Sequence, residues 1–445
     1  MRTVTNRAGE GSFTDNAEPQ SGAQKIRSIL FVGLNYKPEP TGIAVYTTDA
    51  AEGLAALGHR VTVITGYPHY PQWHMDRPYL FGRRDERVHG VRVIRVKHPV
   101  PGRPTLLHRA FMEVVFGVRS VRAIASARDN YDAVICVSPA LLASAIVVAW
   151  FRRRRHRPAV GLWVQDLYSR AAVETGGVAV RAAAWVFALE LRLLHAVDSV
   201  AVIHQRFSTH VVDAMGVPMR RTTTIRNWCH SAPRPEMTRT EARASLGWDQ
   251  WQGAIAVHAG NMGVKQNLDA IVDAAREATR IGADITFVLI GDGNQRTRLE
   301  NSARGMKNVV FMDPMGESDF RAALRGADVL LVSELQSLRE MSLPSKLTSY
   351  FQSGTPVVAA TPSDSITASE MAESGAGLRV EPDAPLAIVE AIRHLADDTE
   401  FAKRCAEAAM RHVDHVLGRD TAMTVLQHWI ESLAGRDASV VAAAR

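Results

Sequence analysis

One segment near the C-terminal end, residues 330–359, limits the possible folds more than any other part of the chain. Apolar runs at 329–332 and 357–359 are typical of parallel strands that helices cover on both faces. Between them, the pattern predicts a short helix that begins at Ser345 and Lys346. The first N–H groups of a helix have no partners within it and attract anions. The segment therefore predicts a binding site for a phosphate or diphosphate at this helix start.

Strand-like and helical patterns alternate along all 445 residues, a length that exceeds one ordinary domain. Strands are predicted in two series, at 29–34, 61–65, 91–96, 133–137, 160–164 and 199–203, and at 254–258, 285–290, 309–312, 329–332 and 357–359. This alternation predicts an α/β fold with two doubly wound, Rossmann-like sheets. Ligands bind at the carboxyl ends of such strands, and we expect both sets of ends to open onto a cleft between the domains.

The domain boundaries follow from where the pattern stops and restarts. We predict a polar, disordered leader at 1–25, a domain at 26–228, a linker at 229–240, a second domain at 241–418, a helix at 419–434 that packs back on the first domain, and a frayed tail at 435–445. The leader lacks the apolar segment of a secretory signal. No uncharged apolar run reaches about eighteen residues, so no transmembrane helix is predicted.

Charge is distributed unevenly between the two halves of the chain. Residues 1–228 hold 30 Lys and Arg against 17 Asp and Glu, whereas the remainder holds 22 against 29. A basic N-terminal half predicts an anionic partner. Residues 106–116 and 150–157 combine aromatic and basic side chains and resemble anchors for a membrane surface. We favour an anionic membrane over nucleic acid, because the chain has no nucleic-acid-binding motif.

Three candidate site residues follow strands of the first domain. Gly42 lies in the first βα turn, which lacks the Gly-x-Gly-x-x-Gly spacing of dinucleotide-binding proteins and so argues against a dehydrogenase. Gln165 and Asp166 follow the strand at 160–164, where polar side chains converge on a substrate. Each position has an ordinary alternative, since glycines and single carboxylates also cap helices.

The second domain offers glycines and a lysine after its first strand. Asn261, Gly263 and Lys265 lie in a loop whose N–H groups can hold an anion, with the lysine as a point charge. The loop does not match a P-loop, and a lone lysine there is more often solvated. Gly291 lies in a Gly-Asp-Gly turn after the next strand, which is a weak signal by itself.

Several motifs together resemble the retaining GT-B glycosyltransferases of family 4, and in particular the WcaI-type branch assigned to colanic acid and other exopolysaccharides. They are Asn-Tyr-x-Pro-Glu-x-Thr-Gly-Ile from residue 35, Leu-x-x-x-Gly-His-x-Val-x-Val-Ile-Thr at 54–65, Tyr-Pro-Gln-Trp at 70–73, Val-Gln-Asp at 164–166, Met-Ser-Leu-Pro-Ser-Lys-Leu-Thr at 341–348 and Ser-Gly-x-Pro-Val-Val from 353. The resemblance covers about residues 26–433, nearly the whole chain.

The resemblance implies a GT-B fold and the transfer of a sugar from a nucleotide-diphosphate sugar with retention at the anomeric carbon. It places the nucleotide sugar in the C-terminal domain and a polyprenyl-linked or glycan acceptor in the N-terminal domain. It implies that neither a metal nor a further cofactor is needed, because basic side chains and a helix dipole stabilise the leaving diphosphate. It also implies a cytoplasmic enzyme, peripheral on the inner face of the plasma membrane.

The family's functional residues map onto this sequence as follows. Gly42 matches the glycine loop, Asp166 the acidic half of a His-Asp pair with Gln165 in place of the histidine, and Lys265 the diphosphate lysine. Asn261 replaces the arginine of the common Gly-Arg loop. Ser342, Ser345, Lys346 and Ser349 fall in the segment where the family carries Glu-x7-Glu, with Ser349 and Met341 at the two glutamate positions; we expect Glu340, one residue away, to compensate.

Two other functions stay open from the sequence. A sugar-nucleotide epimerase on the same architecture would convert the donor without an acceptor. A non-catalytic scaffold would bind the nucleotide sugar but never turn it over, which the missing glutamate pair suggests.

Overall fold

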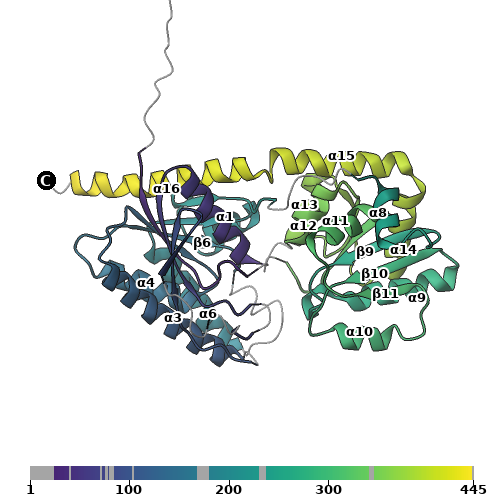
Figure 1. The fold of residues 1–445 in the computed structure, drawn as a ribbon, viewed down its shortest axis with the longest axis horizontal. Helices are drawn as coiled ribbons and strands as arrows, with labels where there is room; N and C mark the ends of the chain where they lie inside the picture. The colour runs from purple at the N-terminus through teal and green to yellow at the C-terminus, as the bar shows by residue number, and fades with distance from the viewer. Residues whose placement is uncertain are drawn as a thin grey trace, which may run out of the picture.

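The computed structural model describes residues 25–39, 42–70, 73–75, 79, 85–102, 105–167, 180–229, 237–339 and 345–442. They form two α/β domains, each built on one central sheet, and the C-terminal helix returns from the second domain to the first (Figure 1). None of the described helices is both long enough and apolar enough to span a bilayer.

The N-terminal sheet has eight strands in the order β3-β4-β2-β1-β5-β6-β7-β8. All pairs are parallel except β3–β4. The strands are β1 (Ser28–Val32), β2 (Arg60–Gly66), β3 (Asp85–Val88), β4 (Val91–Val96), β5 (Ala133–Val137), β6 (Ala159–Val164), β7 (Ser199–Val202) and β8 (Thr222–Thr224). The central strands are fully buried, as expected for a parallel sheet covered on both faces.

Helices cover both faces of this sheet. Helices α3 (Leu106–Ala127), α4 (Leu141–Arg152) and α6 (Val180–Ala196) share one core with the strands, and α1 (Ile43–Ala56) and α16 (Arg419–Ala442) share the other. Figure 1 shows these two layers on opposite sides of the sheet. The short helix α7 (Gln205–Thr209) and a π-helical turn, His210–Ala214, follow β7.

The C-terminal sheet has six parallel strands in the order β11-β10-β9-β12-β13-β14. They are β9 (Ala254–Ala259), β10 (Ile285–Ile290), β11 (Val309–Met312), β12 (Val329–Ser333), β13 (Val357–Ala360) and β14 (Gly377–Val380). The helices of this domain are α8 (Arg239–Leu246), α9 (Leu268–Ile281), α10 (Arg296–Ser302), α11 (Glu317–Gly326), α12 (Lys346–Ser353), α13 (Ile366–Ser374), α14 (Pro385–Asp397) and α15 (Thr399–His415).

Among the parallel strands that the structure describes, each sheet has one point where the chain reverses its direction across the sheet. The reversal lies between β1 and β5 in the first sheet and between β9 and β12 in the second. Open α/β sheets bind ligands outside the carboxyl ends of the strands at such switch points. The topology therefore directs attention to the loops after β1, β9 and β12.

The C-terminal helix α16 packs on the sheet of the N-terminal domain. Trp429 is 3% exposed, and its indole N–H donates to Ser199 Oγ at 2.9 Å. Its ring fills the space beside Gly161 on β6, where a Cβ would come within 2.8 Å of it. Glycine at this position therefore lets the helix approach the sheet closely.

A buried ionic cluster joins the two domains. Arg226, after β8, donates to Glu370 Oε1 on α13 at 2.7 Å, and His412 Nε2 lies 2.8 Å from the same oxygen. His204, after β7, lies 3.3 Å from Glu370 Oε2. Burial raises the pKa of Glu370, but hydrogen bonds from His204 and His412 and the charge of Arg226 outweigh it and hold that pKa well below its usual range. The carboxylate is thus charged and satisfied at the domain contact.

The structure confirms the predicted GT-B class of architecture and differs in local details. Each predicted strand is present within a few residues. Three further strands, β3, β8 and β14, are short edge strands without a long apolar run, so the hydrophobic pattern did not reveal them. Helix α8 begins at Arg239, inside the range predicted as linker, and α16 continues to Ala442, past the point where we expected fraying. The predicted leader lies outside the described residues, apart from Lys25.

The packing of α16 predicts a stability effect. Trp429→Ala should lower the free energy of unfolding by about 3–5 kcal/mol, because it removes a large buried side chain and leaves a cavity. Trp185→Ala is the matched control, since Trp185 is 73% exposed and its replacement should change stability by less than about 0.5 kcal/mol. Urea unfolding of both variants measures the difference. Equal stabilities would mean that α16 does not hold the N-terminal sheet.

Candidate active site between the two sheets

Asp166 follows β6 at the carboxyl edge of the N-terminal sheet. Burial raises its pKa to about 6, and the charge of Lys265 in the other domain lowers it. Burial, followed by the charge of Asp166, also raises the pKa of Tyr70. These effects require proximity, so the fold brings Asp166, Tyr70 and Lys265 into one neighbourhood. Asp166 and Lys265 are among the predicted site residues, whereas Tyr70 was noted only as part of a motif.

The neighbouring Gln165 carries an unusual amide group. Its side chain is 2% exposed, and its Nε2 has no hydrogen-bond partner among the described residues. A buried donor without a partner costs free energy, and such groups often receive a ligand. Gln165 therefore remains a candidate for contact with the transferred group.

Gly42 precedes α1, with φ 65° and ψ −143°. Only glycine adopts this conformation without strain. Glu39, from the same loop, accepts hydrogen bonds at 2.9 Å from the backbone N–H groups of His69 and Tyr70. The ring of Tyr70 lies 4.0 Å from where a Cβ on Gly42 would be. The motif glutamate thus holds the two loops together, and the positive φ of Gly42 explains the glycine that begins α1 beside Tyr70.

Lys265 lies in a short 3₁₀ turn, Val264–Gln266, that follows β9 at the switch point. Its carbonyl accepts a hydrogen bond from Leu335 N at 3.1 Å, which ties the turn to the loop after β12. Gly263 N donates to Gln266 Oε1 at 3.1 Å, and Asn261 is exposed. The predicted loop residues therefore lie together, with Lys265 half-buried at the switch point.

Lys346 is the first residue of α12, and its ammonium group lies beside a buried histidine. Its Nζ is 3.2 Å from Nε2 of His258, which is fully buried on β9. Burial lowers the pKa of Lys346 to about 7; the charge of Glu334 raises it and that of Lys265 lowers it. Burial, followed by the charge of Lys346, lowers the pKa of His258. Lys346 at the start of α12 and Lys265 in the turn after β9 repel each other, so an anion bound between them would be stabilised.

Glu334 is a site residue that the sequence analysis missed. It follows β12 and is 7% exposed, and Thr367 Oγ1 donates to its Oε1 at 2.9 Å. Burial raises its pKa, while the hydroxyl groups of Thr361 and Thr367 and then the charges of Lys265 and Lys346 lower it. A carboxylate that directly follows a strand at the reversal of the sheet was the signal available in the sequence.

Two glycines shape the backbone around the lysines. A Cβ on Gly260 would lie 3.6 Å from Lys346 Nζ, so this backbone borders the ammonium group directly. A Cβ on Gly291 would meet the Gly260 carbonyl oxygen at 2.0 Å. Close packing of the two loops explains why residue 291 is a glycine. The contact between Gly291 and a ligand stays a prediction.

Two of the remaining predicted residues, Ser345 and Ser349, lie at the start of α12. Ser345 is the exposed N-cap, and its side chain makes no capping hydrogen bond. Ser349 is half-buried one turn further on. Glu340 and Ser342 lie outside the described residues.

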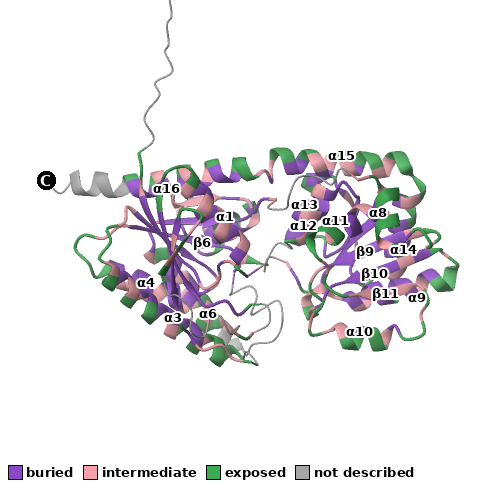
Figure 2. Cartoon of the chain, in the orientation of Figure 1, coloured by how far each residue is buried: buried purple, intermediate pink, exposed green. Residues whose placement is uncertain are grey.

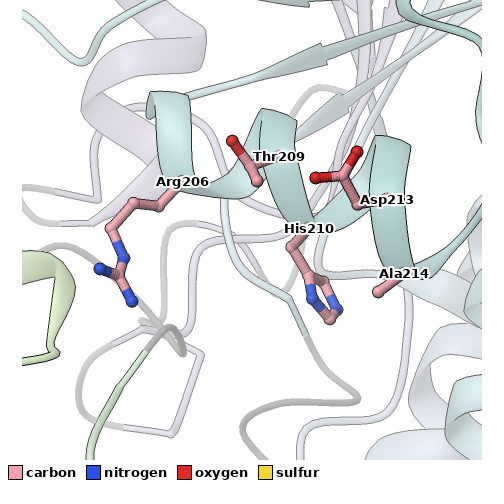
Figure 3. Close-up of a pocket in the computed structure, with 5 residues that line it drawn as sticks. All are labelled: Arg206, Thr209, His210, Asp213 and Ala214. Atoms are coloured by element: carbon pink, nitrogen blue, oxygen red, sulfur yellow. The ribbon is translucent and has the colours of Figure 1, made fainter.

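A pocket of about 370 Å³ lies on the N-terminal domain, along α7 and the π-helical turn (Figure 3). Its lining residues are Arg206, Thr209, His210, Asp213 and Ala214. Arg206 Nη2 also donates to the Asp364 carbonyl of the other domain at 2.7 Å. The pocket therefore begins where the two domains meet, and it combines a guanidinium, an imidazole and a carboxylate.

Comparisons with known proteins agree with this architecture. Residues 41–228 match the family model described as a Glycosyl transferase 4-like domain, and residues 253–398 match the model described as Glycosyl transferases group 1. The putative colanic acid biosynthesis glycosyl transferase WcaI of Escherichia coli (strain K12) is 30% identical over 388 residues, which cover 82% of this chain and 91% of that protein.

Solved structures show the same fold at low sequence identity. Sucrose-phosphate synthase from Thermosynechococcus elongatus superposes with a TM-score of 0.72 at 16% identity, covering 92% of this chain and 100% of that chain. Anabaena HepE in complex with UDP-glucose gives a TM-score of 0.63 at 16% identity, with the same coverage of both chains. The two facing sheets and the site between them thus define a glycosyltransferase of the GT-B fold. The chain belongs to family 4 of these enzymes, in the WcaI-type branch.

The lowered pKa of Lys346 predicts that donor binding takes up a proton. A bound diphosphate favours the charged ammonium, so the pKa of Lys346 should rise from about 7 on binding. Uptake should approach one proton at pH 8 and nearly vanish at pH 6, and affinity should fall as pH rises above 7. Calorimetry with a nucleoside diphosphate in buffers of different ionisation enthalpy measures the uptake. Lys346→Met should abolish it, and unchanged uptake in that variant would exclude Lys346 as the group that titrates.

Asp166 should limit stability at neutral pH. Its pKa of about 6 in the folded protein exceeds its ordinary 3.8, so the cost of burying the charge is absent at low pH and complete above pH 6. Asp166→Asn should therefore stabilise the fold by about 2–3 kcal/mol at pH 8, and by about half as much at pH 5, while lowering activity. Thermal unfolding at the two pH values tests this. A gain independent of pH would contradict the electrostatic explanation.

Proposed function

We propose that the protein is a retaining glycosyltransferase that moves a sugar from a nucleotide-diphosphate sugar to a lipid-linked glycan acceptor during exopolysaccharide or cell-envelope glycan synthesis. The observation that carries the proposal is that Asp166, at the carboxyl end of β6, lies close enough to interact with Lys265 of the other domain, which in turn interacts with Lys346. The name of the E. coli relative, which refers to colanic acid biosynthesis, supports the exopolysaccharide role, and the complex of HepE with UDP-glucose supports a nucleotide sugar as donor.

In the proposed mechanism, the C-terminal domain binds the donor diphosphate. Lys265, Lys346 and the backbone N–H groups at the start of α12 neutralise the negative charge that grows on the leaving diphosphate. Glu334 favours the charged form of Lys346. Basic side chains and the helix dipole supply positive charge without a metal, so a metal-independent reaction stays our prediction.

In the same mechanism, the N-terminal domain holds the acceptor and the reacting sugar. The bond between the anomeric carbon and the diphosphate oxygen breaks, and a bond to the acceptor oxygen forms on the same face. The departing diphosphate oxygen takes the acceptor's proton. Asp166 as a carboxylate stabilises positive charge on the sugar, Gln165 donates to a sugar oxygen, and Gly42 leaves room beside Tyr70.

The acceptor enters, in this proposal, along the pocket beside α7. Arg206 and His210 are suited to an anionic group such as an acceptor phosphate. Figure 3 shows both side chains extending from this segment. A lipid-linked acceptor requires an enzyme at the membrane, so we place the protein as a peripheral protein on the inner face of the plasma membrane.

Replacement of the diphosphate lysine tests the mechanism. Lys265→Ala should lower kcat/KM for transfer at least tenfold, equivalent to about 1.4 kcal/mol of transition-state stabilisation. Lys307→Ala, an exposed lysine of the same domain, is the control and should leave kcat/KM unchanged. The donor is first chosen from UDP-, GDP- and ADP-sugars by thermal shift, and NMR of the product reports the anomeric configuration.

Three outcomes would contradict the proposal. Full activity of Lys265→Ala would remove the role of the lysine, and inversion of the anomeric configuration would exclude the same-face mechanism. Conversion of the donor in the absence of any acceptor would indicate a sugar-nucleotide epimerase instead.

A further inference from the structure

Helix α3 carries a second apolar stripe that the protein core does not cover. Its buried stripe includes Phe116 and Ile124 and packs on the sheet. On the other side, Leu107, Phe111, Val114 and Val118 are exposed; Leu107 is 81% and Phe111 62% exposed. These residues recur at intervals of four, three and four, which places them along one side of a helix. Contiguous exposed apolar surface of this kind marks an interaction site.

Helix α6 adds a large aromatic side chain at the same edge of the domain. Trp185 is 73% exposed in the second turn of α6. Helices α3 and α6 pack on the same face of the sheet, on either side of α4. Each helix connects two parallel strands, so both helices begin at the carboxyl edge of the sheet, where Asp166 interacts with Lys265 of the other domain. Figure 2 shows exposed residues on the outer side of both helices. We call the four exposed apolar residues of α3 together with Trp185 the α3–α6 patch.

The charges around the patch identify the kind of partner. Among the described side chains of α3 and α6, the exposed cationic residues are Arg109, Arg119, Arg122 and Arg192. The acidic ones, Glu113 and Glu190, are both buried. Glu113 accepts a hydrogen bond from Leu142 N at the start of α4, at 2.9 Å. Exposed apolar side chains and exposed arginines on the same two helices, without an exposed carboxylate among the described residues of these helices, complement an anionic lipid surface. A second copy of the chain would instead place arginines against arginines.

The structure also corrects the second anchor predicted from the sequence. In the segment at 150–157, Phe151 is 2% exposed, and Arg154 stacks on the half-buried Trp150 at 4.4 Å. Of the two large aromatic side chains in this segment, Phe151 is therefore buried in the core and Trp150 is half-buried beneath Arg154. This segment offers charge alone, whereas the α3–α6 patch offers apolar insertion together with charge.

We propose that the α3–α6 patch inserts into the headgroup boundary of a bilayer containing anionic lipids and so holds the opening of the interdomain cleft at the membrane surface. The inference deepens the proposed function, on which it rests for the presence of a lipid-linked acceptor. The binding itself involves no sugar transfer, so the two can fail separately.

Vesicle sedimentation tests the patch with the full-length chain. The wild-type protein should bind vesicles of phosphatidylcholine with 30% phosphatidylglycerol at least tenfold more tightly than pure phosphatidylcholine vesicles. Leu107→Asn with Phe111→Asn should weaken binding to the anionic vesicles at least tenfold. The matched control is Met219→Asn with Leu386→Asn, which replaces two exposed apolar residues outside the patch and should bind like the wild type. Circular dichroism and thermal unfolding establish that each variant is folded.

The electrostatic part and the depth of insertion are tested separately. Arg122→Gln and Arg192→Gln should each weaken binding to the anionic vesicles by about fivefold. Lipids with brominated acyl chains should quench tryptophan emission in the wild type. Trp185→Phe should remove most of that quenching.

Several results would overturn the inference. One is equal vesicle binding by the wild type and the Leu107→Asn/Phe111→Asn variant. Another is tryptophan quenching that Trp185→Phe leaves unchanged. A concentration-dependent dimer that the same two substitutions abolish, without vesicle binding, would assign the patch to a protein interface. Vesicle binding without any sugar transfer would contradict the proposed function alone, and transfer to a water-soluble acceptor without vesicle binding would contradict this inference alone.

Discussion

The buried carboxylate of Glu370 is the interaction on which the arrangement of the two domains depends. It belongs to the C-terminal domain, yet two of its partners, Arg226 and His204, come from the other side of the domain contact. Removing one partner of a buried ion pair typically costs about 3–5 kcal/mol, because the other charge stays buried without compensation. The cluster therefore favours one relative position of the sheets. In that position, Asp166 of one domain is close enough to interact with Lys265 of the other.

The same arrangement concentrates electrostatic strain where the ligand is proposed to bind. Burial raises the pKa of Asp166 and lowers that of Lys346, so each group is held in a place where its charge is costly. Structural ion pairs such as Glu370–Arg226 have the opposite character, because their charges are matched within the protein. In many enzymes, a charged group that the rest of the protein does not fully compensate with opposite charge or hydrogen bonds marks a functional site. This difference in charge compensation distinguishes the Glu370 cluster, which holds the domains together, from the candidate active site at Asp166 and Lys346.

Local pattern in the sequence predicted most of the fold, because buried parallel strands form short apolar runs that alternate with longer helical periods. Strands β3, β8 and β14 escaped because each is short and lies at the edge of a sheet, where few apolar residues are needed. For the site, the helix start at Lys346 and the turn at Lys265 were predictable from residue type and position. The contacts of Lys346 with Glu334 and His258 were not, because they join residues far apart in the sequence.

The sequence by itself determined the two α/β domains, the basic character of the first half and the family motifs, since these depend on residue type and spacing along the chain. Only the tertiary structure decided which groups meet across the domains, and which side of α3 is covered. That helix is apolar on two sides, so its periodicity did not distinguish the stripe that packs on the sheet from the stripe at Leu107 and Phe111. Packing decides between them, because a sheet face can cover only one side of a helix, and the other side is left for solvent or for a partner.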